Sequence, residues 1–229
     1  MMNPLQWVWA SAQVGASLVG ASPVPIRSLH AGHREAVRIH LHKLDANDRH
    51  LRFGYAASDA QISRYVDSLD FEHDRFFGVF GHDAQLLAMA HLAMLPPNAL
   101  TQHKQAEFGV SVEARARAQG MGRALYNRAA LHARNVGIAA LYIFVLRENT
   151  AMLRIARAAH AEITGDHDEL DCWATLLPAT METRLAEFWE EQRAQVDYQI
   201  KQTLPYRAIT IAAADPPPAA PRPRDTVSY

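Results

Sequence analysis

Two spacings of apolar residues alternate along the chain from residue 24 onward, and they predict alternating strands and helices. Apolar residues three and four positions apart indicate helices, whereas alternation at every second residue indicates strands with one buried face. The helical stretches are residues 32–44, 59–69, a stretch that ends at Gly137, 150–160 and 180–204. The strand-like stretches are residues 24–29, 75–80, 86–95, 106–112, 139–146, 161–164 and 170–177. Because helices cross between strands, the pattern predicts an α/β chain of the α+β type, with a mixed central sheet flanked by helices.

The strand-like stretch at residues 106–112, AEFGVSV, assigns its side chains to two different faces. Successive side chains of a strand point to opposite sides of the sheet. The apolar face holds Phe108, Val110 and Val112, and the opposite face holds Glu107, Gly109 and Ser111. Residues 139–146 are apolar almost throughout, which is typical of a strand buried on both faces.

Both ends of the chain differ in composition from the part between them. Residues 1–26 carry no charged side chain, and their apolar run lacks a preceding positive charge and is interrupted by Gln, Ser and Gly. These features argue against a secretory signal and a membrane-spanning helix, so residues 1–23 are expected to be an extension that packs on the domain or a partner. Residues 212–229 are rich in proline and predict a flexible tail. A domain is expected over residues 24–178 and a C-terminal helix over residues 179–205.

Composition narrows the class of protein further. The 229 residues are 49% hydrophobic, which suits one domain with a sizeable core plus appendages. The 23 Lys and Arg residues nearly balance the 24 Asp and Glu residues, and a net charge of -1 gives no general attraction for nucleic acid or an acidic membrane. Cys172 is the only cysteine, which excludes an intramolecular disulfide and a multi-cysteine zinc site. A single cysteine fits a reducing compartment, and the protein is expected to be cytoplasmic.

Two glycines, Gly120 and Gly122, precede the predicted helix that ends at Gly137. The start of a helix exposes unpaired amide N–H groups and the positive end of the helix dipole, and glycines let backbone donors approach an anionic oxygen. A phosphate-binding turn is therefore expected. A P-loop is excluded because the chain has no Gly-Lys dipeptide, and a dinucleotide fingerprint fits poorly because Leu125 stands at its third glycine position.

The remaining pattern is R-x-x-G-x-G, formed by residues 117–122 between a strand and a helix. Together with the order strand, loop, helix, strand and asparagine over residues 105–160, it resembles the signature of the GNAT superfamily of N-acetyltransferases. The resemblance extends over residues 24–178 and implies a GNAT-like, mostly antiparallel sheet. It also implies acetyl-CoA as co-substrate without a metal, with the loop around its pyrophosphate. The residues implied to bind acetyl-CoA are Val110, Val112, Arg117, Ala118, Gln119, Gly120, Met121, Gly122, Arg123 and Asn149.

Members of that set are expected to act in different ways. The resemblance assigns the main chain of Val110 and Val112 to the pantetheine arm and to the oxyanion formed during acyl transfer. Arg117 and Arg123 add positive charge beside the loop. Asn149 has two interpretations that stay open, a hydrogen bond to the co-substrate or an ordinary N-cap of the next helix.

Glu107 is the candidate catalytic base. An alkyl ammonium, with a pKa of about 10.4, must lose a proton before it can attack a thioester. The closest subgroup by resemblance, the bacterial protein-lysine acetyltransferases, has a catalytic glutamate at this AEF position; the alternative is a solvated carboxylate or one paired with an Arg. The family often has a tyrosine acid seven residues after the asparagine, and this chain has Ala156 there. His160, at a position where glycine is expected, is the other residue to consider for that role.

The resemblance therefore predicts an N-acetyltransferase that moves an acetyl group from acetyl-CoA to a primary amine by direct attack on the thioester. The acceptor is either a protein lysine or a small-molecule amine. The resemblance does not decide between them, because a fold does not fix a substrate. Ala156 raises an alternative, a non-catalytic acyl-CoA binding sensor or regulatory module. His40 and His42 form the best metal-ligand pair in the sequence, but they point to different sides of a helix without a carboxylate or Cys cluster, so no metal is expected.

Residues 180–204 predict a long amphipathic helix. Its apolar side holds Met181, Leu185, Phe188, Trp189 and Val196. We expect that side to pack on the domain or on a second subunit, which would form a homodimer, or else to cover an acceptor pocket.

Overall fold

The computed structural model describes residues 24–96 and 103–203, so the expected N-terminal extension (1–23) and proline-rich tail (212–229) lie outside the described residues. The strands are β1 (Arg27–Leu29), β2 (Arg75–Phe80), β3 (Leu86–Leu95), β4 (Lys104–Val112), β5 (Ile138–Leu146), β6 (Glu162–Thr164) and β7 (Glu169–Thr175). The α-helices are α2 (Arg34–His42), α3 (Ala46–Phe53), α4 (Asp59–Ser68), α5 (Met121–Asn135), α6 (Thr150–Ala158) and α7 (Met181–Thr203). Two short 3-10 helices are η1 (Ala31–His33) and η2 (Ala114–Ala116).

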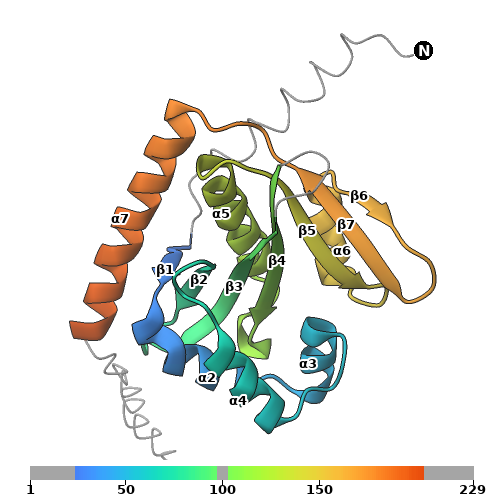
Figure 1. Cartoon of the computed structure of the whole chain (residues 1–229). Helices are drawn as coiled ribbons and strands as arrows, with labels where there is room; N and C mark the ends of the chain where they lie inside the picture. Colours follow the sequence, from blue (N-terminus) through green and yellow to red (C-terminus); the bar gives the residue numbers. More distant parts are fainter. Residues whose placement is uncertain (1–23, 97–102, 204–229) are drawn as a thin grey trace, which may run out of the picture.

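The strands form one seven-stranded sheet in the order β1-β2-β3-β4-β5-β7-β6 (Figure 1). Neighbouring strands are antiparallel except β4 and β5, which run parallel because α5 crosses over between them. The expected mixed, mostly antiparallel sheet flanked by helices is therefore confirmed.

Each face of the sheet has its own hydrophobic core. One core lies against α5 and α6 and includes Leu125 and Met152, while the other lies against α2 and α4 and includes Val37 and Ile62. Phe108 of β4 belongs to the first core. The odd-numbered residues of β4 consequently face the α2–α4 side, as the alternation in the sequence predicts.

The strongest local sequence signals give the element boundaries. The predicted strands at residues 75–80 and 86–95 match β2 and β3. The Ser58 side chain accepts a hydrogen bond from the Gln61 N–H and begins α4. At Gly137, a backbone φ of +81° follows the end of α5, a conformation that glycine adopts without strain.

Helix α3 is absent from the sequence-based expectations. Asp45 caps it by accepting a hydrogen bond from the Asp48 N–H, and Gly54 ends it with a φ of +79°. Its only large apolar residues, Leu51 and Phe53, stand two positions apart, which is not the three- or four-residue spacing that indicates a helix, and none of its residues is fully buried. The Asp45 cap and Gly54 were the signals available in the sequence.

Helix α7 forms as expected, but the expectation that its apolar side packs on the domain is wrong. The apolar side chains of α7 are more than half exposed at Met181, Leu185, Phe188, Trp189 and Val196. The helix instead lies beside β1 and α5 (Figure 1), where its polar residues Glu187 and Glu191 hold the buried Arg128 guanidinium at 2.9 and 3.0 Å. Packing of the exposed side on a second subunit stays a prediction. Among the described helices, none is both long and apolar enough to cross a bilayer.

Candidate active site

The parallel strands β4 and β5 are paired over only part of their length. Their pairing ends at Glu107 on β4 and Tyr142 on β5. Beyond that point β4 continues to Val112 bonded only to β3, and β5 continues to Leu146 bonded only to β7. The β5-facing edge of β4 after Glu107 therefore has no strand partner in the part of the chain that the structure describes.

The direction of the backbone shows which residues present main-chain groups at this edge. The Glu113 N–H donates to the Leu87 carbonyl of β3 at 2.9 Å. Because main-chain groups point alternately to the two sides of a strand, Val110 and Val112 direct theirs away from β3. In agreement, the Val112 carbonyl accepts a hydrogen bond from Arg117 Nε at 3.4 Å. The two valines expected to contact the co-substrate thus present their N–H groups along the unpaired edge.

The loop that leads into α5 presents further unpaired donors. Gly120 precedes the helix in the left-handed conformation, with a φ of +74°, and Ala118 has a φ of +59°. The first hydrogen bond of the helix is made by the Ala124 N–H to the Gly120 carbonyl. Among the described residues no acceptor is found for the N–H groups of residues 118–123. Together with the helix dipole, these groups make a site suited to a diphosphate.

Gly120 has open space beside it, whereas the polar side chains of the loop differ in whether they have partners. A Cβ added at Gly120 would meet no atom within 4 Å, so the space beside it is open. Arg117 forms an ion pair with Asp48 of α3, and its charge is therefore partly compensated. Arg123 is exposed, and Gln119 donates to the Arg115 carbonyl at 3.5 Å. The backbone is consequently the main source of donors for an anion here.

Glu107 lies half-buried on the α2–α4 face, where β4 and β5 separate. No described Lys, Arg or His nitrogen lies within ion-pair distance of its carboxylate, so the alternative of a direct Arg pair finds no partner among the described residues. Two tyrosines stand near it. Burial raises the pKa of Tyr65 and Tyr142, and the negative charge of Glu107 contributes to both shifts. The Tyr142 hydroxyl donates to Asp171 Oδ1 at 2.5 Å.

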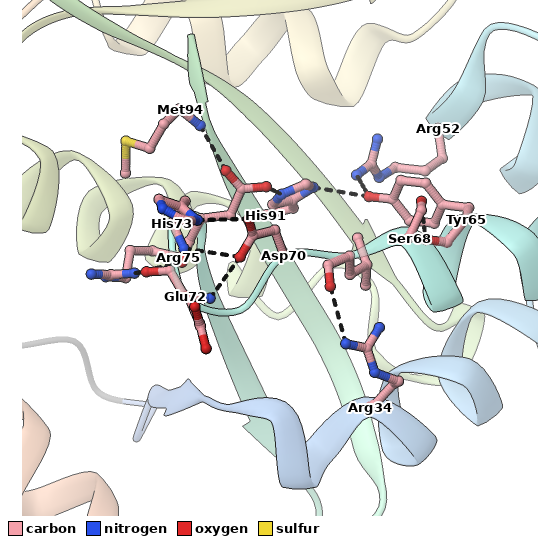
Figure 2. A network of polar contacts seen from close by, with 12 residues as sticks. Arg34, Arg52, Tyr65, Ser68, Asp70, Glu72, His73, Arg75, His91 and Met94 are labelled. Carbon is pink, nitrogen blue, oxygen red and sulfur yellow. Dashed lines mark hydrogen bonds and ion pairs between the residues drawn. The ribbon is translucent and has the colours of Figure 1, made fainter.

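A polar chain that sequence reasoning missed lies on the same face (Figure 2). Arg52 Nη2 donates to the Tyr65 hydroxyl at 3.3 Å, and that hydroxyl lies 2.9 Å from His91 Nδ1. His91 Nε2 lies 2.8 Å from Asp74 Oδ2, and Asp74 Oδ1 accepts the Met94 N–H at 2.9 Å. These residues come from α3, α4, β3 and the turn before β2, and no motif in the sequence connects them.

Asn149, Ala156 and His160 are positioned around α6. The Asn149 side chain accepts the Met152 N–H at 3.0 Å, so it caps α6 in the structure. Ala156 is fully buried in the core, and no hydroxyl takes the place of the family's tyrosine at that position. His160 lies in the exposed turn after α6 with a φ of +52°, the left-handed region in which glycine is usual.

The two histidines of the HLH sequence have separate structural partners. His40 is fully buried, with Nε2 2.8 Å from Ser111 Oγ and Nδ1 3.1 Å from the Leu86 carbonyl. Burial lowers the His40 pKa to about 4, so its ring is neutral at pH 7. His42 Nε2 instead lies 3.2 Å from Ser63 Oγ. Within residues 24–96 and 103–203 no group of three or more His, Cys, Asp or Glu side chains is arranged to hold a metal ion.

Several solved structures share this fold. The GNAT domain of the S. lividans protein PAT is 17% identical, with 66% of this chain and 89% of that chain covered and a TM-score of 0.55. RimL, a ribosomal L7/L12 alpha-N-protein acetyltransferase in complex with coenzyme A, is 16% identical over 71% of this chain and 99% of that chain, with a TM-score of 0.53. Spermidine N-acetyltransferase from Vibrio cholerae, in complex with CoA and spermine, is 18% identical over 66% and 94%, with a TM-score of 0.51.

Sequence comparison leads to the same fold. No curated protein matches the sequence. The sequence model of the acetyltransferase (GNAT) family matches residues 38–160, which is more than half of the 229 residues and includes β4, the loop and α5. The chain therefore belongs to the acetyltransferase (GNAT) family.

Proposed function

We propose that the protein is an acetyl-CoA dependent N-acetyltransferase that transfers an acetyl group to a primary amine by direct attack on the thioester. The observation that carries the proposal is the unpaired edge of β4 beside a loop of unpaired amide donors. Val110 and Val112 offer N–H groups along that edge, and residues 118–123 offer N–H groups at its end. An extended acyl-CoA, with amide groups along its arm and a diphosphate at its end, matches these donors in kind and order.

The chain's own groups supply what amine attack requires. Acetyl-CoA brings an activated acetyl group as a thioester. The N–H groups of Val110 and Val112 are oriented to donate to a carbonyl oxygen that gains negative charge. Glu107, half-buried and without an ion-pair partner in the described part of the chain, is placed to accept the ammonium proton on the α2–α4 face.

Loss of the usual acid at Ala156 affects the leaving group. A thiol has a pKa of about 8.5, so a thiolate leaves without a dedicated proton donor at moderate cost. We therefore expect slower turnover than with a tyrosine acid, and catalysis is retained. Asn149 acts as a helix cap in this proposal, which accounts for its bond to the Met152 N–H.

The similar structures include enzymes for both classes of acceptor. RimL is an alpha-N-protein acetyltransferase of ribosomal L7/L12, and the Vibrio cholerae enzyme is a spermidine N-acetyltransferase. Mass spectrometry of a cell lysate incubated with the protein and labelled acetyl-CoA would separate the two classes, because the label enters either protein or small molecules.

The proposal is tested by calorimetry with acetyl-CoA, followed by an assay of CoA release with a panel of amines. We expect binding, and CoA release that depends on an amine. Binding without release on any amine would favour the sensor or regulatory alternative that Ala156 raises. Absence of binding at millimolar acetyl-CoA would contradict both.

A further inference from the structure

The Arg52 guanidinium lies directly against β4. A Cβ added at Gly109 would lie 2.6 Å from Arg52 Nη2, 2.7 Å from Cζ and 2.8 Å from Nη1. A guanidinium can therefore occupy this place only because residue 109 has no side chain. Gly109 follows Glu107 by two positions and faces the same side of the sheet. The structure thus places a cation beside the candidate base, where β4 has lost its β5 partner.

The neutral Tyr65 hydroxyl holds the Arg52 guanidinium in this place. Burial lowers the His91 pKa, which favours the neutral ring, and the 2.8 Å contact of Nε2 with Asp74 Oδ2 favours the tautomer with the proton on Nε2. His91 Nδ1 then accepts the Tyr65 hydroxyl proton, and the Tyr65 oxygen keeps a lone pair for Arg52 (Figure 2). The chain thus orients the guanidinium through a hydroxyl group, without an ion pair to Arg52 among the described residues.

Unlike Arg52, two neighbouring arginines form ion pairs with carboxylates. Arg49, on the same helix, pairs with Asp59 at 2.8 Å, and Arg117 pairs with Asp48. Arg52 has no carboxylate within 4.0 Å among the described residues, although its side chain is half-buried. Half-buried cations are usually paired, and most of the five guanidinium donors of Arg52 remain available for a ligand.

We propose that Arg52 binds a carboxylate of a substrate while Glu107 faces the reacting amine. A carboxylate and an amine a few ångströms apart describe an amino acid as acceptor. The same carboxylate can instead belong to the acyl group, as in a dicarboxylic acyl-CoA. This inference rests on the proposed function, and it narrows the substrate class from any primary amine to a reaction in which one substrate carries a carboxylate.

The test compares matched substrates that differ by one carboxylate. In the first arm, phenylalanine and lysine are compared with phenethylamine and 1,5-diaminopentane, with acetyl-CoA as donor. In the second arm, succinyl-CoA is compared with acetyl-CoA on the same amines. We expect the carboxylate to raise kcat/KM by at least about tenfold in one arm, the scale of a charge-assisted hydrogen-bonded pair.

Two variants test whether Arg52 causes the preference for a substrate with a carboxylate. Arg52→Gln should abolish it, and Gly109→Ala should weaken it, because the added Cβ displaces the guanidinium without removing its charge. The control is Arg64→Gln, which removes an exposed cation of α4 and should keep the full preference. Circular dichroism checks that each variant is folded.

A binding measurement keeps the inference independent of turnover. Calorimetry should show that wild-type protein binds the favoured carboxylate compound at least about tenfold more tightly than Arg52→Gln does. Equal affinity of the two proteins, or turnover without preference in both arms, would overturn the inference while leaving the proposed function standing. Failure of the proposed function would appear differently, as absence of acetyl-CoA binding and of CoA release.

Discussion

At the scale of single residues, Glu107 lies at the point where β4 leaves β5, and its side chain faces the α2–α4 side. The strand alternation AEFGVSV made this orientation predictable from sequence. The neighbours of Glu107 were not predictable, because Tyr65, Tyr142 and Arg52 come from three other elements. Contacts between distant segments leave no local pattern in a sequence.

Replacing Glu107 with Gln should lower kcat by roughly 10² or more, the scale of general-base catalysis, with little change in acetyl-CoA affinity. The amide keeps the shape of the side chain but cannot accept a proton. The deficit should shrink as the pH approaches the pKa of the amine, because the acceptor then arrives partly neutral. Steady-state kinetics from pH 6 to 9 measure both effects.

The matched control is Glu162→Gln, which changes an exposed carboxylate of β6 and should leave kcat unchanged. Wild-type kcat in Glu107→Gln across this pH range would remove Glu107 from the mechanism. A water relay would then be the better account of proton removal.

At the scale of elements, strands with strong alternation and helices with caps were predictable, and α3 and the position of α7 were not. Helix α3 has no fully buried side chain, yet its Asp48 pairs with Arg117 of the loop before α5 and its Arg52 lies against β4. Helix α7 was recognised by its apolar residues, but the side that meets the domain holds other residues, among them Glu187, Ala194 and Tyr198. Periodicity shows that a helix has an apolar side and does not show what that side meets.

Glu187 joins α7 to α5 through contacts with Arg128, His132 and Asn135. Burial alone would raise its pKa, but hydrogen bonds from His132 and Asn135 and the charge of Arg128 outweigh burial and hold it at about 2. A depressed carboxyl pKa stabilises the fold above the unfolded value of 4.5, and this contribution is lost as the pH falls toward about 2.

Glu187→Gln should therefore lower the free energy of unfolding by roughly 1–3 kcal/mol at pH 7. The difference from wild type should shrink as the pH falls from 4.5 toward 2. Urea denaturation at pH 7, 4.5 and 3 measures it, with Glu182→Gln in the exposed first turn of α7 as control. A difference that is independent of pH would show that the Glu187 charge does not hold the helix.

At the scale of the whole molecule, the fold separates two tasks onto different parts of the sheet. The unpaired edge of β4 and the loop that leads into α5 present main-chain donors, while the α2–α4 face presents Glu107 and Arg52. The loop motif and the flanking strand order were sufficient to predict the fold and the location of the main-chain donors. The proposed acceptor side depends on α3 and the Tyr65–His91 chain, which come from distant segments, so sequence alone did not predict their arrangement.

The central claim is that the loop leading into α5, residues 118–123, binds acetyl-CoA. Calorimetry on two glycine variants tests this claim most directly. Gly120 and Gly137 lie at opposite ends of α5, with φ of +74° and +81°, and an added Cβ meets nothing within 4 Å at either. Gly120→Asp and Gly137→Asp therefore impose similar backbone strain. Only the first places a negative charge among the unpaired donors.

We predict that Gly120→Asp weakens acetyl-CoA binding by at least about tenfold, more than one lost hydrogen bond of about 1 kcal/mol, while Gly137→Asp binds like wild type. The unfolding temperature of each variant shows whether strain alone affects the fold. Binding by Gly120→Asp within about twofold of wild type, or equal weakening in both variants, would contradict the account.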